Sequence, residues 1–439
     1  MDYLEFWERF RKAEDLGDVF NLRALGFDLY PMLRTRFYYQ LAQDLGVFDN
    51  PHPNPEAKQD PIPLDSLDAL AGKKAKVVVV PFVRKVAGVD PYSKPITDAL
   101  PGALVLEHES DGDFDISRIR ALGKAKYDSY VQEQLLQQKI RDQKERWAKM
   151  VEAFASELGA SLGKFDEYPA WLIRRYISEC LIFRDFFTTL GTKKLYLVNA
   201  YSSPFLVVGA KLAGAKVLEL QHGFISEYHP AYSYPKIRVQ SAADKVLVWG
   251  KYWAKAASFP KGSKPVVVGP AENYLKARTQ VSGVAKKPNS ILFSSQGAVG
   301  KELYAAALSW AKLLPDFAIT FRLHPNEDLA DYQMLEGAAN LSLSHKTPTF
   351  LDVLGEHEYL VGGFSTTLYE GVSFGLKVFV LPLSGFENVQ PALDSGDMTL
   401  VPNQISAREL KTLLLTAKPS ANPYSYYAAS LNTAKALRA

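Results

Sequence analysis

VGGFSTTLYEGV, residues 361–372, is the stretch that decides the predicted fold. The apolar run 359–361 that leads into it is typical of a short buried strand, and the apolar run 378–381 beyond it is typical of the next parallel strand. Gly362 and Gly363 allow the backbone to turn tightly after the first strand, and a helical pattern then continues to about Gly375. The order strand, glycine turn, helix and strand predicts an α/β unit.

Three hydroxyl residues, Ser365, Thr366 and Thr367, stand where this helix is expected to begin. The open N–H groups of a helix start form an anion site, and neighbouring hydroxyls add donors. Glu370 follows one turn later and could reach a ribose, so a nucleotide monophosphate or diphosphate fits the arrangement. The alternative is structural: Thr367 and Glu370 have the spacing of a capping box, in which the carboxylate only satisfies the N–H of Thr367.

The composition is that of an ordinary globular protein, with 439 residues of which 47% are apolar and 23% charged. That length predicts two large domains or three small ones. The net charge of +3 gives no indication of nucleic-acid binding, and the single cysteine, Cys180, excludes an intrachain disulfide. The acidic start of the chain has no signal-peptide pattern, and no stretch approaches the ~20 apolar residues of a membrane span, so a cytoplasmic protein is expected.

Residues 1–48 combine a helical pattern with many aromatic residues, and Arg34 and Arg36 lie among them. This mixture is typical of an interfacial membrane helix, which leaves peripheral membrane contact open. The interpretation that we prefer is a helical hairpin packed on the main body. Residues 1–66 are therefore assigned to a helical, aromatic-rich segment that ends in a proline-rich linker.

Alternating strand and helix patterns fill the rest of the chain. The strands expected in a first domain, residues 67–275, are the apolar runs at 76–82, 104–106, 195–198, 217–220, 246–249 and 266–268. Those of a second domain, residues 276–420, follow a polar linker at 276–289 and lie at 291–294, 318–321, 341–343, 359–361 and 378–381. Strands separated by helices predict parallel sheets, so the expected fold class is α/β with two facing Rossmann-like domains. Residues 421–439 are expected to form a helix that crosses back onto the first domain.

Candidate side chains directly follow three of these expected strands. His222 ends a strand of the first domain, Arg322 and His324 end one of the second, and the turn 365–367 ends another. Ligands of such sheets bind outside the carboxyl ends of the strands, so the three groups are expected to share a cleft. Sugar transfer needs a base for the acceptor hydroxyl and stabilisation of the departing phosphate. Arg322 and His324 suit the phosphate, whereas His222 suits the base or a contact with the donor sugar.

Weaker candidates surround these groups. The loop 221–235 (QHGFISEYHPAYSYP) is expected to line the acceptor side with Gln221, Gly223, Glu227, His229 and Tyr232. Asp111 and Asp113 could supply a carboxylate base instead of His222, or could belong to a solvated acidic loop. Ser295 and Gln296 could add donors near the nucleotide. The sequence after the first strand of the second domain lacks the GxGxxG pattern of dinucleotide-binding loops, and the chain has no GxxxxGK[ST] phosphate loop. No DxD-type cluster is evident, so no metal is expected.

Gln221-His222-Gly223, His324-Pro325 and the turn 365–367 with Glu370 resemble motifs of the GT-B glycosyltransferases that make bacterial surface polysaccharides. The capsule-type enzymes that use CMP-activated acidic sugars, the Kdo and sialic acid transferases, are the most similar. The resemblance covers roughly residues 75–420. It implies that His324 and the turn 365–367 bind the nucleotide phosphate, and that Glu370 binds ribose or base. Ser110-Asp111-Gly112 matches the Asp/Glu-Asp/Glu-Gly motif of some sialyltransferases only in part, so the identity of the base stays open.

The hypothesis from the sequence is therefore a metal-independent glycosyltransferase of capsule or lipopolysaccharide biosynthesis. It would need no cofactor, and its partners would be a nucleotide-sugar donor and a saccharide or lipid-linked glycan acceptor. Two alternatives share the architecture: a CDP-glycerol-type glycerophosphotransferase and a UDP-sugar 2-epimerase. The third alternative is a non-catalytic binding or assembly protein that retains the fold.

Overall fold

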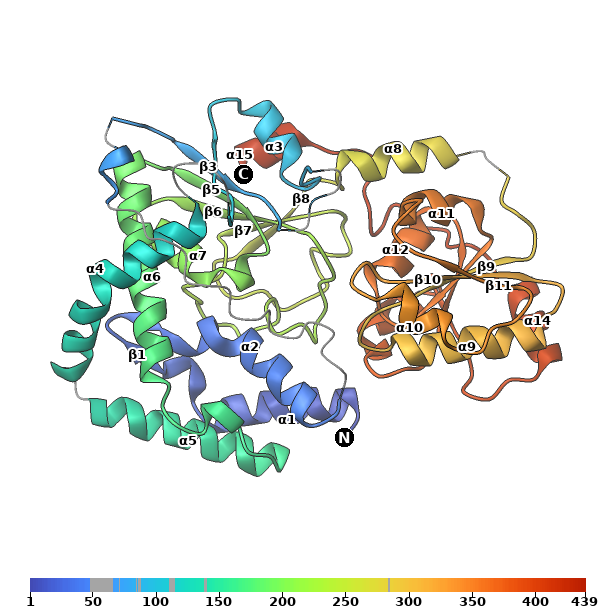
Figure 1. The fold of residues 1–439 in the computed structure, drawn as a ribbon, viewed down its shortest axis with the longest axis horizontal. Coiled ribbons are helices and arrows are strands. Elements are labelled where there is room, and N and C mark those ends of the chain that lie inside the picture. Colours follow the sequence, from blue (N-terminus) through green and yellow to red (C-terminus); the bar gives the residue numbers. More distant parts are fainter. Residues whose placement is uncertain are drawn as a thin grey trace.

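The fold was analysed in a computed structural model that describes residues 1–47, 66–70, 72–83, 85, 88–109, 115–137, 140–282 and 285–439. Asp111 and Asp113 lie outside the described residues. Two α/β domains stand side by side, the first in blue to green colours and the second in orange (Figure 1). The expected α/β class with two Rossmann-like domains and a helical N-terminal segment is confirmed by two six-stranded parallel sheets.

The first sheet has the strand order β4-β3-β5-β6-β7-β8. Its strands are parallel throughout, and their bounds are Val77–Val80 (β3), Leu104–Val105 (β4), Lys194–Val198 (β5), Lys216–Leu220 (β6), Lys245–Val248 (β7) and Lys264–Val267 (β8). Because β4 lies on one side of β3 and all later strands lie on the other, the order reverses between β3 and β5. Such a reversal separates the connecting loops and opens a crevice at the carboxyl ends of the strands.

The second sheet has the order β11-β10-β9-β12-β13-β14. Its parallel strands are Ser290–Ser294 (β9), Ala318–Arg322 (β10), Leu341–Ser344 (β11), Tyr359–Gly362 (β12), Lys377–Val380 (β13) and Thr399–Leu400 (β14). Numbered along the chain this order is 3-2-1-4-5-6, the arrangement of dinucleotide-binding sheets. The reversal falls between β9 and β12, so the stretch 361–372 begins at the switch point itself.

Helices cover both faces of each sheet (Figure 1). Those of the first domain are Lys94–Ala99 (α3), Ile116–Gln137 (α4), Ile140–Leu158 (α5), Ala170–Leu190 (α6) and Pro204–Leu212 (α7). Those of the second are Gly300–Leu313 (α9), Leu329–Gln333 (α10), Phe350–Glu356 (α11), Thr366–Ser373 (α12), Gln390–Asp394 (α13) and Ala407–Thr416 (α14). Glu272–Val281 (α8) crosses between the domains, so part of the expected linker is helical. It folds there because Tyr274 and Ala277 are buried.

The N-terminal segment consists of Tyr3–Leu16 (α1), a short hairpin of Arg23–Ala24 (β1) and Phe27–Asp28 (β2), and Leu29–Asp44 (α2). Phe6, Phe10, Phe37 and Tyr38 are at most 2% exposed and belong to the core of the first domain. The aromatic side chains that suggested an interfacial membrane helix are therefore buried in the protein. They pack in tilted and edge-to-face arrangements with one another and with Phe154 of α5, with ring centres 4.9 to 5.2 Å apart.

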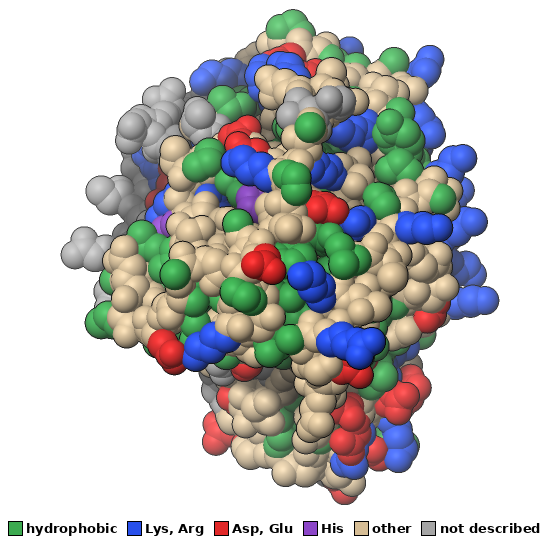
Figure 2. All heavy atoms as spheres, turned by 90° about the vertical axis from the view of Figure 1, so that its right-hand side faces the viewer, with side chains coloured by type: hydrophobic (Ala, Val, Ile, Leu, Met, Phe, Trp, Pro, Cys, Tyr) green, Lys and Arg blue, Asp and Glu red, His purple; other side chains and the backbone are tan. Residues whose placement is uncertain are grey.

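The surface side chains were compared with those expected of a protein that contacts a membrane. On the face shown in Figure 2, apolar side chains are interspersed with charged and polar ones. None of the helices in the described parts of the chain is long and apolar enough to cross a membrane.

An aromatic cluster joins the two domains. Trp253 of the first domain lies 4.8 Å from Tyr369 of α12, and Tyr369 lies 4.8 Å from Tyr426 of the C-terminal segment. The indole N–H of Trp253 also donates to the carbonyl of Tyr426 at 2.7 Å. The chain then returns to the first sheet as Thr433–Arg438 (α15), a shorter helix than the one expected over 421–439. Three segments distant in sequence thus share one core.

The return of the C-terminal segment depends on Gly250. A Cβ at this position would lie 2.2 Å from the carbonyl oxygen of Tyr426, which is backbone and cannot move aside cheaply. We expect Gly250→Ala to destabilise the protein by about 1–3 kcal/mol, measured by urea unfolding. Gly223→Ala is the matched control, because a Cβ there meets no atom within 4 Å. Equal stability of the two variants would contradict this packing.

Candidate functional site

The two loops at the switch point of the second sheet are held together by their own side chains. The hydroxyl of Ser294, at the end of β9, donates to the hydroxyl of Thr367 at 2.9 Å. The backbone N–H of Phe364, after β12, donates to the side-chain oxygen of Gln296 at 3.2 Å. Thr367 and Gln296 therefore fix the position of the turn, and the hydroxyl of Ser365 and the half-buried Thr366 remain next to the start of α12.

The helix start differs from the capping box considered for Thr367. Ser365 is the N-cap, and its hydroxyl accepts from the N–H of Thr367 at 3.3 Å. The N3 position is consequently Leu368, so Glu370 lies too far into α12 to return to the cap. The capping-box alternative is wrong, because the carboxyl of Glu370 does not bond to the start of the helix.

Glu370 is half-buried on α12. Burial raises the pKa of its carboxyl to about 8. Across the described ranges no side chain forms a hydrogen bond or ion pair with this carboxyl, and its electrostatic neighbours are the phenols of Tyr274 and Tyr427. A carboxyl in such surroundings without a polar partner is suited to accept hydrogen bonds from a ligand.

His324 follows β10 and is half-buried. Its Nδ1 accepts from the backbone N–H of Asn326 at 3.3 Å, which places the proton of the neutral ring on Nε2. The loop around it is organised by Glu327. That carboxylate accepts from the N–H of His324 at 2.6 Å and from the hydroxyl of Ser295 at 2.9 Å. Glu327 thus connects the ends of β9 and β10.

Sequence reasoning missed Glu327. One trace of its position is present in the sequence, because α9 begins with a glycine. A Cβ at Gly300 would lie 2.1 Å from Oε1 of Glu327. The carboxylate therefore lies against a helix start, where negative charge is favourable. Ser295 was expected near the nucleotide, but its hydroxyl serves this internal network.

Arg322 has a different environment from the one expected. Its side chain is 6% exposed, and the guanidinium donates to the hydroxyl of Ser344 at 2.7 Å and to the carbonyl of Lys346 at 2.9 Å. Ser344 is the last residue of β11 and Lys346 follows it, on the side of β10 remote from β12. The guanidinium consequently stabilises the β10–β11 edge and is not directed at the switch point.

In the first domain His222 follows β6. Its ring lies 5.0 Å from that of Phe82, which follows β3, and its Nε2 is 3.4 Å from the hydroxyl of Tyr201, which follows β5. Three strand ends around the switch point of the first sheet therefore converge on this histidine. Gln221 does not join them: its amide donates to the carbonyl of Gly223 at 2.9 Å and accepts from the N–H of Trp249 at 2.9 Å. Gln221 and the carbonyl of Gly223 thus stabilise the loop itself.

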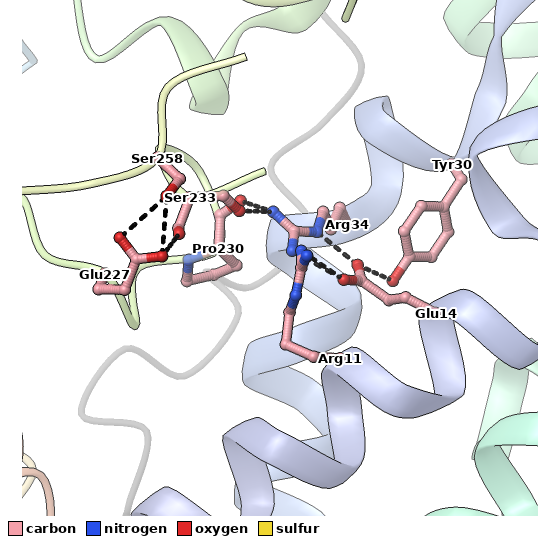
Figure 3. A network of polar contacts seen from close by, with 8 residues as sticks. All are labelled: Arg11, Glu14, Tyr30, Arg34, Glu227, Pro230, Ser233 and Ser258. Atoms are coloured by element: carbon pink, nitrogen blue, oxygen red, sulfur yellow. Dashed lines mark hydrogen bonds and ion pairs between the residues drawn. The ribbon is translucent and has the colours of Figure 1, made fainter. Parts of the chain in front are cut away.

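The other acceptor-side candidates also support the loop. Glu227 accepts from the hydroxyls of Ser233 and Ser258, each at 3.0 Å (Figure 3). Tyr232 donates to Glu219 at 2.9 Å, and burial raises the pKa of that carboxyl to about 7. His229 packs against the rings of Tyr201 and Tyr232 at tilted angles, and burial lowers its pKa to about 3 and keeps the ring neutral. The structure therefore assigns His222 to the strand-end group and the other three residues to the packing behind it.

A buried arginine holds the same loop from the N-terminal segment. Arg34 is 0% exposed, and its guanidinium donates to the carbonyls of Pro230 and Ser233 (Figure 3). Its charge is matched by Glu14 of α1, with Nη2 and Oε2 2.9 Å apart, and Tyr30 donates to the same carboxylate at 2.7 Å. The N-terminal helices are thereby part of the structure that positions the loop after His222.

The two strand-end groups face each other across the domain boundary. Phe224, two residues after His222, lies 6.0 Å from the ring of Tyr369, the neighbour of Glu370. The hydroxyl of Ser226 donates to the side-chain oxygen of Asn388 in the second domain at 2.7 Å. The loop after β6 therefore contacts α12 directly. The loop that carries His222 and the helix that carries Glu370 are thus in contact across the domain boundary.

Comparisons with known proteins find likenesses to solved structures only. No family model matches the sequence, and no curated protein does. Solved structures that match include MurG from Acinetobacter baumannii, with a TM-score of 0.43 and 14% identity over 78% of this chain and 90% of that one. The UDP-GlcNAc 2-epimerase from Methanocaldococcus jannaschii matches with a TM-score of 0.46 and 11% identity over 82% and 98%. The spinosyn rhamnosyltransferase SpnG matches with 0.40 and 14% over 83% and 94%. The two-domain assignment rests on the sheet topology above.

The Arg34–Glu14 pair generates a stability prediction. Replacement of Arg34 by Met leaves the buried carboxylate of Glu14 with only the partly exposed Arg11, 3.0 Å away, as a charge partner. Removal of one partner from a buried pair typically costs about 3–5 kcal/mol. The double replacement Arg34→Met with Glu14→Met removes both charges and should be less destabilising than Arg34→Met alone. Urea unfolding of the two single variants and the double variant measures the coupling. Additive effects of the two single changes would contradict a mutually dependent pair.

The raised pKa of Glu370 predicts how stability changes with pH. Between the ordinary carboxyl pKa and about 8, the folded state holds a proton that the unfolded state has lost, so stability falls as pH rises through this window. The full effect of one group is about 1.4 kcal/mol per pH unit, and solvent at the exposed edge of the side chain reduces it.

Glu370→Gln should remove that contribution and become progressively more stable than wild type from pH 5 to pH 8, as measured by urea unfolding. The exposed Glu8→Gln on α1 is the control. A stability difference between Glu370→Gln and wild type that is constant over the range would refute the assigned pKa.

Proposed function

We propose that this protein is a glycosyltransferase that moves a sugar from a nucleotide-sugar donor to the hydroxyl of a saccharide acceptor. The observation that carries the proposal is the apposition of two switch points. His222 follows a strand of the first sheet, Glu370 follows a strand of the second, and Phe224 against Tyr369 joins the two loops at 6.0 Å between ring centres. This arrangement suits a reaction between two ligands, because each sheet can bind one of them at its own crevice.

On the donor side, the start of α12 is the proposed phosphate site. Its first N–H groups and the hydroxyls of Ser365 and Thr366 supply donors, while the Ser294–Thr367 bond keeps the turn rigid. Glu370 is proposed to accept from the ribose hydroxyls. A carboxylate accepts such bonds better than a carboxyl, so nucleotide binding should lower its pKa and release a proton near pH 7.

On the acceptor side, His222 is the proposed base. Its ring takes the proton of the acceptor hydroxyl, whose oxygen forms a bond to the anomeric carbon while the bond from that carbon to the donor phosphate oxygen breaks. Negative charge then develops on the departing phosphate. The Nε2–H of His324 is proposed to donate to it, since Nδ1 accepts from Asn326. Every group in this scheme belongs to the chain or to the two substrates, so the proposal requires no cofactor.

The donor class rests on the motif resemblance. Its closest pattern is that of transferases of CMP-activated acidic sugars such as Kdo and sialic acid, which act in surface polysaccharide biosynthesis. We therefore propose a CMP-linked acidic sugar as the donor and a saccharide of the cell surface as the acceptor, presented free or on a lipid.

The test is nucleotide binding by titration calorimetry with CMP, CDP, UDP, GDP and ADP, in two buffers of different ionisation enthalpy at pH 7. We expect CMP to bind with release of a proton. Glu370→Gln should weaken binding about tenfold or more and abolish the proton release, because a hydrogen bond to a charged group contributes about 1.5–3 kcal/mol. A thermal shift with CMP at 100 times Kd should correspond to about 2.7 kcal/mol.

Glu336→Gln serves as the control, since this side chain of the second domain is 68% exposed. Binding of UDP in place of CMP would refute the CMP-linked donor while the switch-point site stands. CDP-glycerol transfer, or interconversion of a free UDP-sugar without an acceptor, would select the corresponding alternative enzyme. No binding of any of the five nucleotides would refute the proposed function and favour the non-catalytic binding protein.

A further inference from the structure

A cavity of about 290 Å³ opens at the amino ends of β7 and β8. Its walls are the β1–β2 hairpin of the N-terminal segment, the connection 238–244, the turn 261–263 and the last turn of α7. His222 follows the carboxyl end of β6, so the cavity and the proposed catalytic site lie at opposite ends of the first sheet. The cavity is therefore a separate place on the molecule.

Four cations and two carboxylates line this cavity. The cations are Arg23, Lys211, Arg238 and Lys261, and the carboxylates are Asp28 and Asp244. Nε of Arg23 lies 2.7 Å from Oδ1 of Asp28, and Nζ of Lys211 lies 3.4 Å from Oδ1 of Asp244. The second oxygen of each carboxylate accepts from a backbone N–H. Every oxygen of the two carboxylates therefore has a partner, and they compensate only two of the four cations.

Arg238 and Lys261 are the two cations without a carboxylate partner in the described part of the chain. Both also border an adjoining cavity that contains Asp15 and Asp18. Asp18 is paired with Arg146 at 3.4 Å, and Asp15 forms no ion pair with either cation among the described residues. A surplus of two positive charges therefore remains in the cavity.

The neutral polar side chains of the cavity also present donors. Ser263 and Gln240 line it, and neither the hydroxyl of Ser263 nor the side-chain N–H groups of Gln240 have a hydrogen-bond partner within the described ranges. The side-chain oxygen of Gln240, by contrast, accepts from the backbone N–H of Asp28 at 3.3 Å. The side-chain acceptors of the cavity are thus satisfied and several of its donors are not, which suits an anion with several oxygens.

The turn around Gly262 holds two of these groups beside Arg238. Gly262 has a φ of +100°, which favours glycine, and a Cβ there would lie 3.3 Å from Nη1 of Arg238. The backbone N–H of Lys261 donates to the carbonyl of Ile237, the neighbour of Arg238, at 2.6 Å. The guanidinium therefore lies against the turn that carries Lys261 and Ser263, so the unbonded donors are gathered on one side of the cavity.

We propose that this cavity binds a phosphate dianion, either as the head group of a small phosphate monoester or as the free ion. A phosphate monoester carries about −1.5 to −2 charges at pH 7, which matches the two uncompensated cations. A guanidinium fork binds two phosphate oxygens at once, and an ammonium adds a point charge. A monocarboxylate would leave one cation uncompensated. The volume of about 290 Å³ is near the lower size limit of small-ligand pockets, so only a small organic body fits beside the phosphate.

A phosphate in this cavity would connect the N-terminal segment to the body of the first domain. Arg23 and Asp28 belong to the hairpin, whereas Arg238 and Lys261 belong to the segments that flank β7. Asp28 is also the N-cap of α2, the helix that carries Arg34. Bound phosphate should therefore stabilise the folded protein, because the unfolded chain does not bring these segments together.

The test is titration calorimetry of the full chain with ethyl phosphate and with inorganic phosphate, at pH 7.5 and constant ionic strength. We expect binding, and a rise of the thermal unfolding midpoint that NaCl at the same ionic strength does not produce. The double variant Arg238→Gln with Lys261→Gln should weaken binding at least tenfold, because it removes charge-assisted hydrogen bonds. The control Lys144→Gln with Lys149→Gln removes the same charge from exposed positions of α5 and should stay within twofold of wild type.

Arg238 and Lys261 are exposed, so the double variant should keep the wild-type unfolding midpoint in the absence of phosphate. Tighter binding of ethyl phosphate than of inorganic phosphate would identify a monoester as the ligand, and the reverse order would identify the free ion. The proposal would be overturned by no binding of either probe, by unchanged affinity in the cavity variant, or by equal weakening in the control.

The start of α12 is also proposed to bind a phosphate, so a competition measurement separates the two sites. Saturation with CMP should leave the affinity for ethyl phosphate within twofold, because the sites lie at a distance from each other. If CMP displaces ethyl phosphate and the cavity variant still binds it, the ion occupies the start of α12, and this inference fails while the proposed function survives. A chain that binds no nucleotide, but loses ethyl phosphate in the cavity variant, would have the opposite meaning.

Discussion

The burial of Arg34 is the constraint on which the first half of the site depends. A guanidinium removed from water is unfavourable unless its charge is paired and its N–H groups are bonded. Glu14 provides the charge, and the carbonyls of Pro230 and Ser233 take further donors. Because those carbonyls belong to the loop that starts at Gln221, α1, α2 and the surroundings of His222 form a single cooperative structure. The N-terminal segment is thus part of the site's scaffold and not an accessory.

A comparable constraint orients the part of the site that lies in the second domain. Tyr369 is 0% exposed in the aromatic cluster between the domains, where it contacts Trp253 and Tyr426. The next residue of a helix points about 100° away around the axis. Burial of Tyr369 therefore fixes the direction of Glu370 as well, on the side of α12 where the phenols of Tyr274 and Tyr427 lie. The interaction that joins the domains is also the one that aims a carboxyl without a polar partner, so domain packing and site geometry cannot change independently.

The sequence was sufficient for those features that depend on periodicity. Apolar runs separated by helical patterns identified the parallel strands, and their ends located His222, His324 and the turn at 365–367. What it could not supply is the direction of side chains beyond a strand end. Arg322 and His324 are two residues apart, yet one is bonded to the β11 edge and the other to the loop of Glu327. Glu327 escaped notice, and Arg34 was noted only as a basic residue among aromatic ones, because their roles arise from partners 32 and about 200 positions away in the chain. The N-cap of α12 lies two residues before the one that the capping-box interpretation assumed, because Ser365 caps the helix in place of Thr367.

The two ends of the first sheet follow opposite electrostatic logic. At the carboxyl end, burial keeps His229 neutral and raises the pKa of Glu219, so the surroundings of His222 contain few charges. At the amino end, Lys194 is paired with Lys216 and Lys245 with Lys264 on adjacent strands. With a net charge of only +3 over 439 residues, this concentration is not a consequence of a basic chain. Two of these lysines, Lys194 and Lys245, donate to main-chain oxygens of α15, so the return of the C-terminal segment also stabilises this end of the sheet.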